Sequence, residues 1–207
     1  MKKNKVKLII VLFIAIVVIL ILISFLNKNY NNSKKIGNNI SIKEIEKTIL
    51  NINSYKTELD VTIKSNKNEN KYKLYQEVKN GREMQKVIDP DYLKGTEIIY
   101  ENGKLQIKNT KINVSKFYEN YPNIANNELF LSDFMRKFNK SDNKEIKEKE
   151  NQIIFKLKNG AIYNQEQILT IEKGNQNDDN LKITMKILDS NNNTRIYIIY
   201  SKIEFDI

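Results

Sequence analysis

Strict alternation of apolar and polar residues constrains the fold of this chain more than any other feature. From Tyr55 to Lys64, the side chains Tyr, Thr, Leu, Val and Ile occupy every second position, and polar or charged residues fill the positions between them. A period of two is typical of a strand with one buried face. After a polar turn at 66–70, a second alternation runs from Tyr72 to Val78. The two runs together predict a β-hairpin.

The same pattern recurs along the rest of the chain, where short alternating runs are separated by Asn, Gly and Asp. The run Glu101-Asn102-Gly103 is typical of a tight hairpin turn. The further candidate strands are 82–88, 97–100, 104–107, 111–114, 145–149, 152–157, 167–172, 181–188 and 195–205. We therefore predict a mainly β domain of the α+β class, with few helices on one long antiparallel sheet.

Two segments have helical spacing instead. Ser41 and Glu44 form a capping-box pattern ahead of a helix from about 42 to 51. One face of this helix carries Ile42, Ile45, Ile49 and Leu50. The second helix is predicted within 127–138, where aromatic residues recur at every fourth position with apolar residues beside them. These residues are Phe130, Leu131, Phe134, Met135 and Phe138.

The run from Leu8 to Leu26 is uncharged, and Ser24 is its only polar residue. Nineteen helical residues span roughly 28 Å, close to the thickness of a hydrocarbon core. We expect residues 1–26 to form a membrane anchor; a cleaved signal peptide is the alternative. Four lysines precede the run, so the positive-inside rule predicts a cytoplasmic N-terminus at the cell membrane. Residues 27–39 would be a flexible tether, and 40–207 an extracytoplasmic domain.

The composition restricts the chemistry. With no Cys and no His, the chain lacks thiol and imidazole nucleophiles, disulfides and the common zinc ligands. The six glycines are too dispersed for a phosphate-binding loop. We predict no enzymatic activity, no catalytic residue, no metal and no cofactor. Four lysines of the predicted anchor contribute four of the ten net positive charges, so the rest of the chain carries a net charge of only +6. Only three of the basic residues are Arg, the side chain best suited to bidentate contacts with bases and phosphates, so nucleic-acid binding is disfavoured.

Two groups of residues are candidates for a binding site. The stripe of Phe130, Leu131, Phe134, Met135 and Phe138 would pack the second helix on the sheet, or it would line an acyl-binding concave face and act as its lid. An aromatic cluster precedes that helix, in a predicted loop where burial is less compulsory. This cluster, the candidate partner-binding site, consists of Phe117, Tyr118, Tyr121 and Pro122.

Four segments together resemble a known family. They are TELDVTIKSNKNENKYKLYQEV at 57–78, GTEIIYENGKLQI at 95–107, ELFLSDFMRKF at 128–138 and ITMKILDSNNNTRIYIIYSKIEF at 183–205. In this pattern, which covers roughly 40–207, the chain resembles the germination lipoproteins (GerS-like) of endospore-forming bacteria, within the wider LolA/LolB-like group. The resemblance implies a curved, incompletely closed antiparallel half-barrel with helices packed into its mouth.

The resemblance also implies two functions. In LolA-like carriers the concave face holds acyl chains, whereas the germination lipoproteins bind a cortex-modifying N-acetylmuramoyl-L-alanine amidase during spore formation. A lipoprotein needs a lipobox Cys, but residues 22–27 read LISFLN, so a transmembrane helix would replace the lipid. We expect a membrane-anchored partner of such an amidase in sporulation and germination, with the space between forespore and mother cell as one location. The alternative is a lipid or lipoprotein carrier or sensor; a homodimer and a bound lipid stay open.

Overall fold

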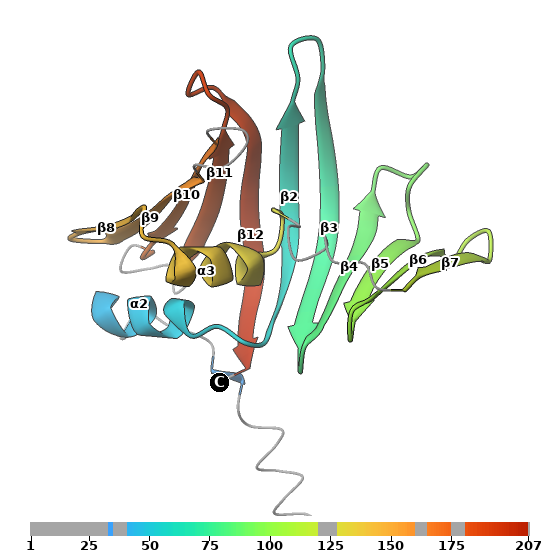
Figure 1. Ribbon diagram of the computed structural model, residues 1–207, viewed down its shortest axis with the longest axis horizontal. Helices are drawn as coiled ribbons and strands as arrows, with labels where there is room; N and C mark the ends of the chain where they lie inside the picture. Colours follow the sequence, from blue (N-terminus) through green and yellow to red (C-terminus); the bar gives the residue numbers. More distant parts are fainter. Residues whose placement is uncertain (1–32, 35–40, 120–127, 160–164, 175–180, 207) are drawn as a thin grey trace, which may run out of the picture. The chain divides into compact units, whose positions relative to one another are not determined.

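The computed structural model describes residues 33–34, 41–119, 128–159, 165–174 and 181–206 (Figure 1). The chain divides into two units, residues 1–34 with residue 207 and residues 35–206. Strand β1 (Ser33–Lys34) is the described part of the first unit. The predicted anchor at 1–26 lies outside the described residues, as does most of the predicted tether. Within the part that is described, no helix has the length and apolar character to cross a membrane.

The second unit is built on one antiparallel sheet. Its strands are β2 (Tyr55–Lys64), β3 (Glu69–Lys79), β4 (Arg82–Asp89), β5 (Thr96–Glu101), β6 (Lys104–Asn109), β7 (Val114–Tyr118), β8 (Lys144–Lys149), β9 (Gln152–Asn159), β10 (Gln165–Glu172), β11 (Lys182–Leu188) and β12 (Thr194–Asp206). They follow the order β7-β6-β5-β4-β3-β2-β12-β11-β10-β9-β8. β7 and β8 end this order at opposite sides, so the sheet is not closed. The predicted mainly β fold with an open antiparallel sheet is confirmed.

The predicted hairpins form with the expected turns. β2 and β3 pair over their whole length, with Tyr55 opposite Val78 and Lys64 opposite Glu69. Residues Asn102 and Gly103 between β5 and β6 both have positive φ, 50° and 75°. Two successive positive φ angles match the right-handed twist of the flanking strands.

Two helices, α2 (Ile42–Leu50) and α3 (Leu131–Lys140), lie on one face of this sheet (Figure 1). The predicted capping box of α2 is confirmed: the Glu44 amide donates to Ser41 Oγ at 3.2 Å, and the Ser41 amide donates to the Glu44 carboxylate at 3.0 Å. A capping box satisfies two backbone N–H groups that the helix itself leaves without acceptors.

The start of α3 differs from its prediction, because the helix begins at Leu131 and not at 127. Its N-cap residue, Phe130, has no side chain that accepts a hydrogen bond. The hydroxyl of Tyr55 supplies the missing acceptor and receives the backbone N–H groups of Leu131 at 3.1 Å and Ser132 at 3.5 Å. The cap is therefore tertiary, and it places the helix start opposite the first residue of β2.

The sheet curves around α3. Ser132 of this helix contacts Glu83 of β4, whereas the Phe138 ring meets the Phe155 ring of β9 edge to face at a centroid distance of 5.4 Å. Six interstrand spacings separate β4 from β9, about 29 Å in a flat sheet, and a ten-residue helix is only about 15 Å long. A flat sheet would leave one of these contacts unmade, so the sheet is concave toward the helices.

Strand β7 is displaced from its prediction at 111–114 and spans Val114–Tyr118. The side chain of Asn109 explains the shift, because its Oδ1 accepts the backbone N–H groups of Lys111 at 3.0 Å and Ile112 at 3.3 Å. This Asx turn diverts residues 110–113 from an extended conformation. The other strands begin and end within a few residues of their predicted positions.

Candidate functional site

The apolar stripe of α3 lies in the core. Its five residues are between 0 % and 2 % exposed, and the Phe134 and Phe138 rings stack at 5.8 Å. They pack with residues from both halves of the sheet, among them Leu59 and Phe155. The stripe Phe130, Leu131, Phe134, Met135 and Phe138 thus fills the space between α3 and the sheet.

The predicted aromatic cluster is not a single loop. Phe117 and Tyr118 lie in β7, and because successive residues of a strand point to opposite faces, their side chains diverge. Phe117 pairs with Gln106 of β6, and Tyr118 pairs with Leu105. Tyr121 and Pro122 lie outside the described residues. The prediction that these residues form one cluster in a loop was therefore wrong for Phe117 and Tyr118, because strand β7 includes both of them.

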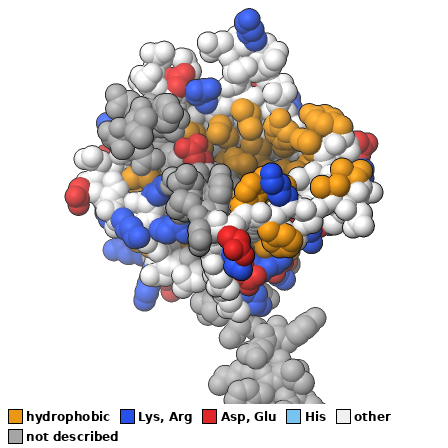
Figure 2. Space-filling view, turned by 45° about the vertical axis from the view of Figure 1, so that its right-hand side comes forward, with side chains coloured by type: hydrophobic (Ala, Val, Ile, Leu, Met, Phe, Trp, Pro, Cys, Tyr) orange, Lys and Arg blue, Asp and Glu red, His pale blue; other side chains and the backbone are white. Residues whose placement is uncertain are grey.

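An apolar surface continues from the helices across β5, β6 and β7. Glu83, which contacts α3, pairs with Tyr100 of β5, and from there the register leads through Leu105 to Tyr118. Directly opposed residues of antiparallel strands share a face. We call Ile98, Tyr100, Leu105, Ile107 and Tyr118 the inner apolar surface. Figure 2, which turns the β4–β7 side forward, shows hydrophobic side chains gathered in a hollowed patch.

A second apolar group lies at the end of the sheet. The turn after β6 contacts the connection between β4 and β5, because the Thr110 amide donates to the Gly95 carbonyl at 3.0 Å. Four strongly exposed residues from these segments and from β7 form what we call the exposed edge: Tyr92 (77 % exposed), Ile112 (68 %), Val114 (57 %) and Phe117 (64 %). Among the described residues, no strand pairs with the outer side of β7.

The opposite end strand has a different chemistry. β8 reads Lys-Glu-Ile-Lys-Glu-Lys, with Ile146 as its only uncharged residue, and all six residues are exposed. Charged side chains on an end strand discourage pairing with another chain, because pairing would remove them from water. β7 carries a single charged residue, Lys116. The two ends of the sheet therefore differ in their capacity to accept a partner.

A partly buried polar network joins α3 to β4. The Ser132 hydroxyl donates to Glu83 Oε1 at 3.2 Å, and the Arg136 guanidinium lies 3.8 Å from the same oxygen. Arg136 also donates to the buried Asp133 at 2.7 Å. Lys137 Nζ lies 2.7 Å from the other Asp133 oxygen, as an ion pair without hydrogen-bond geometry. Burial raises the pKa of the Glu83 carboxyl, although Arg136 and Ser132 oppose this effect.

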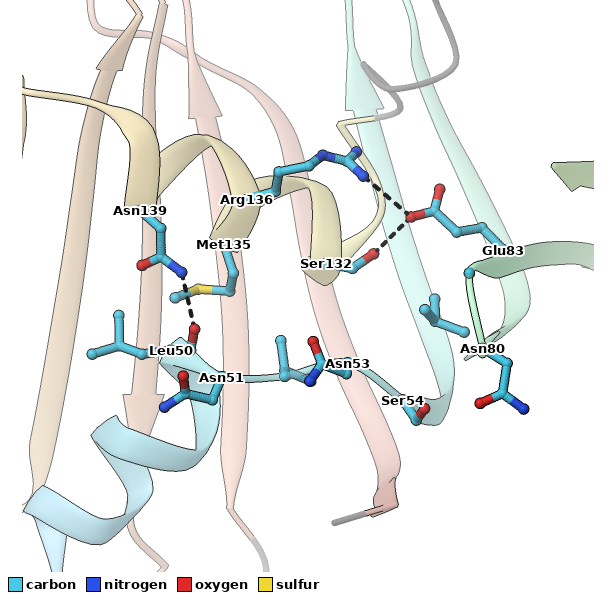
Figure 3. Close-up of a pocket in the computed structure, with 13 residues that line it drawn as sticks. Leu50, Asn51, Asn53, Ser54, Asn80, Glu83, Ser132, Met135, Arg136 and Asn139 are labelled. Carbon is cyan, nitrogen blue, oxygen red and sulfur yellow. Dashed lines mark hydrogen bonds and ion pairs between the residues drawn. The ribbon is translucent and has the colours of Figure 1, made fainter. Parts of the chain in front are cut away.

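A pocket of about 630 Å³ opens beside this network (Figure 3). Three segments line it: residues 50–54, from the last residue of α2 to the residue before β2; residues 78–83, from the end of β3 through the turn into β4; and the face of α3 that carries Ser132, Arg136 and Asn139. Sequence reasoning missed the pocket because these segments are far apart in the chain. The only local signal was the polar spacing of those three residues on a helix whose other face is apolar.

Neither the known protein families nor the curated proteins include a match to this sequence. Solved structures do include similar chains. One belongs to the complex of the CwlD amidase with the GerS lipoprotein from Clostridioides difficile, with 24 % identity, 77 % of this chain and 91 % of that chain covered, and a TM-score of 0.46. Another is a LolA superfamily protein from Nitrosomonas europaea, with 11 % identity, 80 % and 93 % covered, and a TM-score of 0.42. The similarity to these two structures fits the resemblance that the sequence pattern indicated.

Proposed function

We propose that this chain is a non-enzymatic binding protein, anchored by its N-terminal segment at the outer face of the cell membrane, that docks a protein partner on its exposed edge. The observation that supports this proposal is the exposed edge. Phe117 is 64 % exposed on an end strand whose backbone is open to pairing among the described residues. Exposed apolar groups beside an unpaired strand edge favour association with another polypeptide.

The proposed partner is a cortex-modifying N-acetylmuramoyl-L-alanine amidase. This choice comes from the resemblance of the sequence to the germination lipoproteins, which bind such an enzyme. The chemistry of the chain is compatible with a supporting role, since it has neither Cys nor His. The pair of Arg136 with the buried Glu83 ties α3 to the sheet, whereas the buried Asp133 pairs with Arg136 and Lys137 within α3 itself.

Two matched substitutions test the docking surface. Phe117→Asp places a charge on the exposed edge, and Ile146→Asp places the same charge on β8 at the other end of the sheet. We expect Phe117→Asp to weaken binding of the organism's own amidase by about 5- to 30-fold, the cost of removing an aromatic contact of about 1–2 kcal/mol. Ile146→Asp should leave binding unchanged. Equal effects from the two variants would contradict docking at β7.

A lipid or lipoprotein carrier is the second candidate, and the inner apolar surface favours it. Tyr100 and Tyr118 are only partly buried and Ile107 is exposed, although all three share the face on which the helices pack. Ile107→Asp should remove co-purifying lipid if this surface holds acyl chains, without affecting the amidase. Mass spectrometry of lipid extracted from the full chain, with Phe117→Asp as the control, separates the two functions.

The proposed membrane position has its own test. Protease added to intact protoplasts should digest residues 40–207, because the positive-inside rule puts them outside the cytoplasm. Protection of these residues from the protease in protoplasts, with digestion after lysis, would overturn the proposed orientation.

A further inference from the structure

The pocket between α3, the β3–β4 turn and residues 50–54 has an unusual lining for this chain. Lysine is abundant in the sequence, yet among the described residues that line the pocket Arg136 is the only cation and Glu83 the only carboxylate. Their opposite charges lie 3.8 Å apart and neutralise each other. A neutral lining does not attract phosphates or other anions, so the pocket fits an uncharged ligand.

Amide and hydroxyl side chains are the most numerous polar side chains of the described lining. The described lining contains four asparagines and two serines, and it contains no aromatic side chain. Asn53 and Asn80 are exposed at the pocket rim, and no described residue hydrogen-bonds their side-chain amides. Figure 3 shows these two residues on the two connections that border the pocket. Each amide offers two donors and an acceptor, which match the mixed donor and acceptor pattern of hydroxyl and acetamido groups.

The Glu83 carboxylate adds an acceptor on the same side. Ser132 and Arg136 both contact Oε1, so among the described contacts Oε2 stays available (Figure 3). Leu50, Ile52, Val78 and Met135 contribute apolar atoms to the lining. A pocket lined by both apolar and polar groups holds a ligand that has both a methyl group and hydrogen-bonding groups.

We propose that this pocket binds an N-acetylated sugar, as a free oligosaccharide or as a unit of a glycan strand. The acetamido group supplies an amide that pairs with Asn53 or Asn80 and a methyl group that contacts Met135. Ring hydroxyls donate to the Glu83 carboxylate. A volume of about 630 Å³ is within the range of small-molecule sites. None of these residues belongs to the exposed edge, so the proposal does not rest on the proposed partner.

Asn80 allows a clean test because its conformation has a counterpart elsewhere. Asn80 and Asn102 both have positive φ, 51° and 50°, and each precedes a glycine in a two-residue hairpin turn. Glycine adopts this conformation without strain, so Asn80→Gly removes the pocket amide and keeps the turn. Asn102→Gly makes the same change in the β5–β6 turn, outside the pocket. Asn53→Ala is a second pocket variant in a different segment.

Binding of di-N-acetylchitobiose to the full chain is measured by saturation-transfer NMR titration, with cellobiose as the analogue that lacks acetamido groups. We expect saturable binding of chitobiose that Asn80→Gly or Asn53→Ala weakens about three- to tenfold, the worth of one lost hydrogen bond, and that Asn102→Gly leaves unchanged. Circular dichroism tests whether each variant is folded. If one pocket variant is unfolded, the binding measured with the other pocket variant decides the test. Equal binding of cellobiose, binding insensitive to the folded pocket variants, or preference for a capped dipeptide over chitobiose would each overturn the proposal, as would no binding at millimolar chitobiose.

Discussion

Tyr55→Phe removes one oxygen atom from the core, and the structure gives the cost of that change. The Tyr55 hydroxyl accepts the N–H groups of Leu131 and Ser132 and lies 3.4 Å from Gln76 Oε1, to which it donates. Loss of a helix N-cap costs about 1 kcal/mol, and a buried N–H left without an acceptor costs about 1–3 kcal/mol. Both costs include the hydrogen bond of the Leu131 N–H, so they do not simply add. We expect the free energy of unfolding to fall by about 2–3 kcal/mol in total.

This loss is large against a typical stability of about 5–15 kcal/mol. Urea unfolding of the purified chain measures it, because the substitution should lower the midpoint without changing the slope. Tyr75→Phe is the matched control, since the Tyr75 hydroxyl donates to Glu77 in a partly exposed position and its loss should cost less than about 0.5 kcal/mol. If both variants unfold at the same urea concentration, the Tyr55 hydroxyl is not the cap of α3 that we describe.

Three further predictions concern stability. Phe134→Ala should cost about 3–5 kcal/mol by urea unfolding, because it leaves a cavity in the core, whereas the exposed Phe117→Ala should cost little. Burial raises the pKa of Glu83, so the folded chain holds this proton more tightly than the unfolded chain, and stability should fall as the pH rises through the interval between the two values. Glu83→Gln should lack this fall, so its stability relative to the wild type should improve as the pH rises through the same interval. Gly95→Ala should cost about 1–3 kcal/mol and more than Gly81→Ala, because both have positive φ but only a Cβ at Gly95 would lie 3.0 Å from Thr110 Oγ1; equal losses would contradict this packing.

The sequence predicted the strands well because their information is local. In β2 and β3 the period of two assigns each side chain to a face, and that face is the one the structure buries from Tyr55 to Val61 and from Leu74 to Val78. The predicted hairpin turns depend on adjacent residues only. Local pattern was therefore enough for the elements of the sheet and for its antiparallel class, whereas the incomplete closure was implied by the family resemblance.

The errors arise where a distant residue or a side-chain hydrogen bond decides the backbone. α3 begins four residues late because its cap is Tyr55, 76 residues earlier in the chain. β7 is displaced because Asn109 forms an Asx turn. The pocket was not predicted because its lining residues are distant in the sequence: Asn53, Asn80 and Arg136 come together only after the hairpins and α3 have formed.

The unequal ends of the sheet also limit how copies of this chain could assemble. Endless growth of a β-sheet requires that one end of each molecule accept the other end of the next. β8 opposes this head-to-tail addition with five charged residues out of six, while β7 does not. Growth through β7 alone stops after one addition, as a two-fold dimer or a one-to-one complex. A chain with one end strand that can accept a partner is in this way protected from polymerising into fibres.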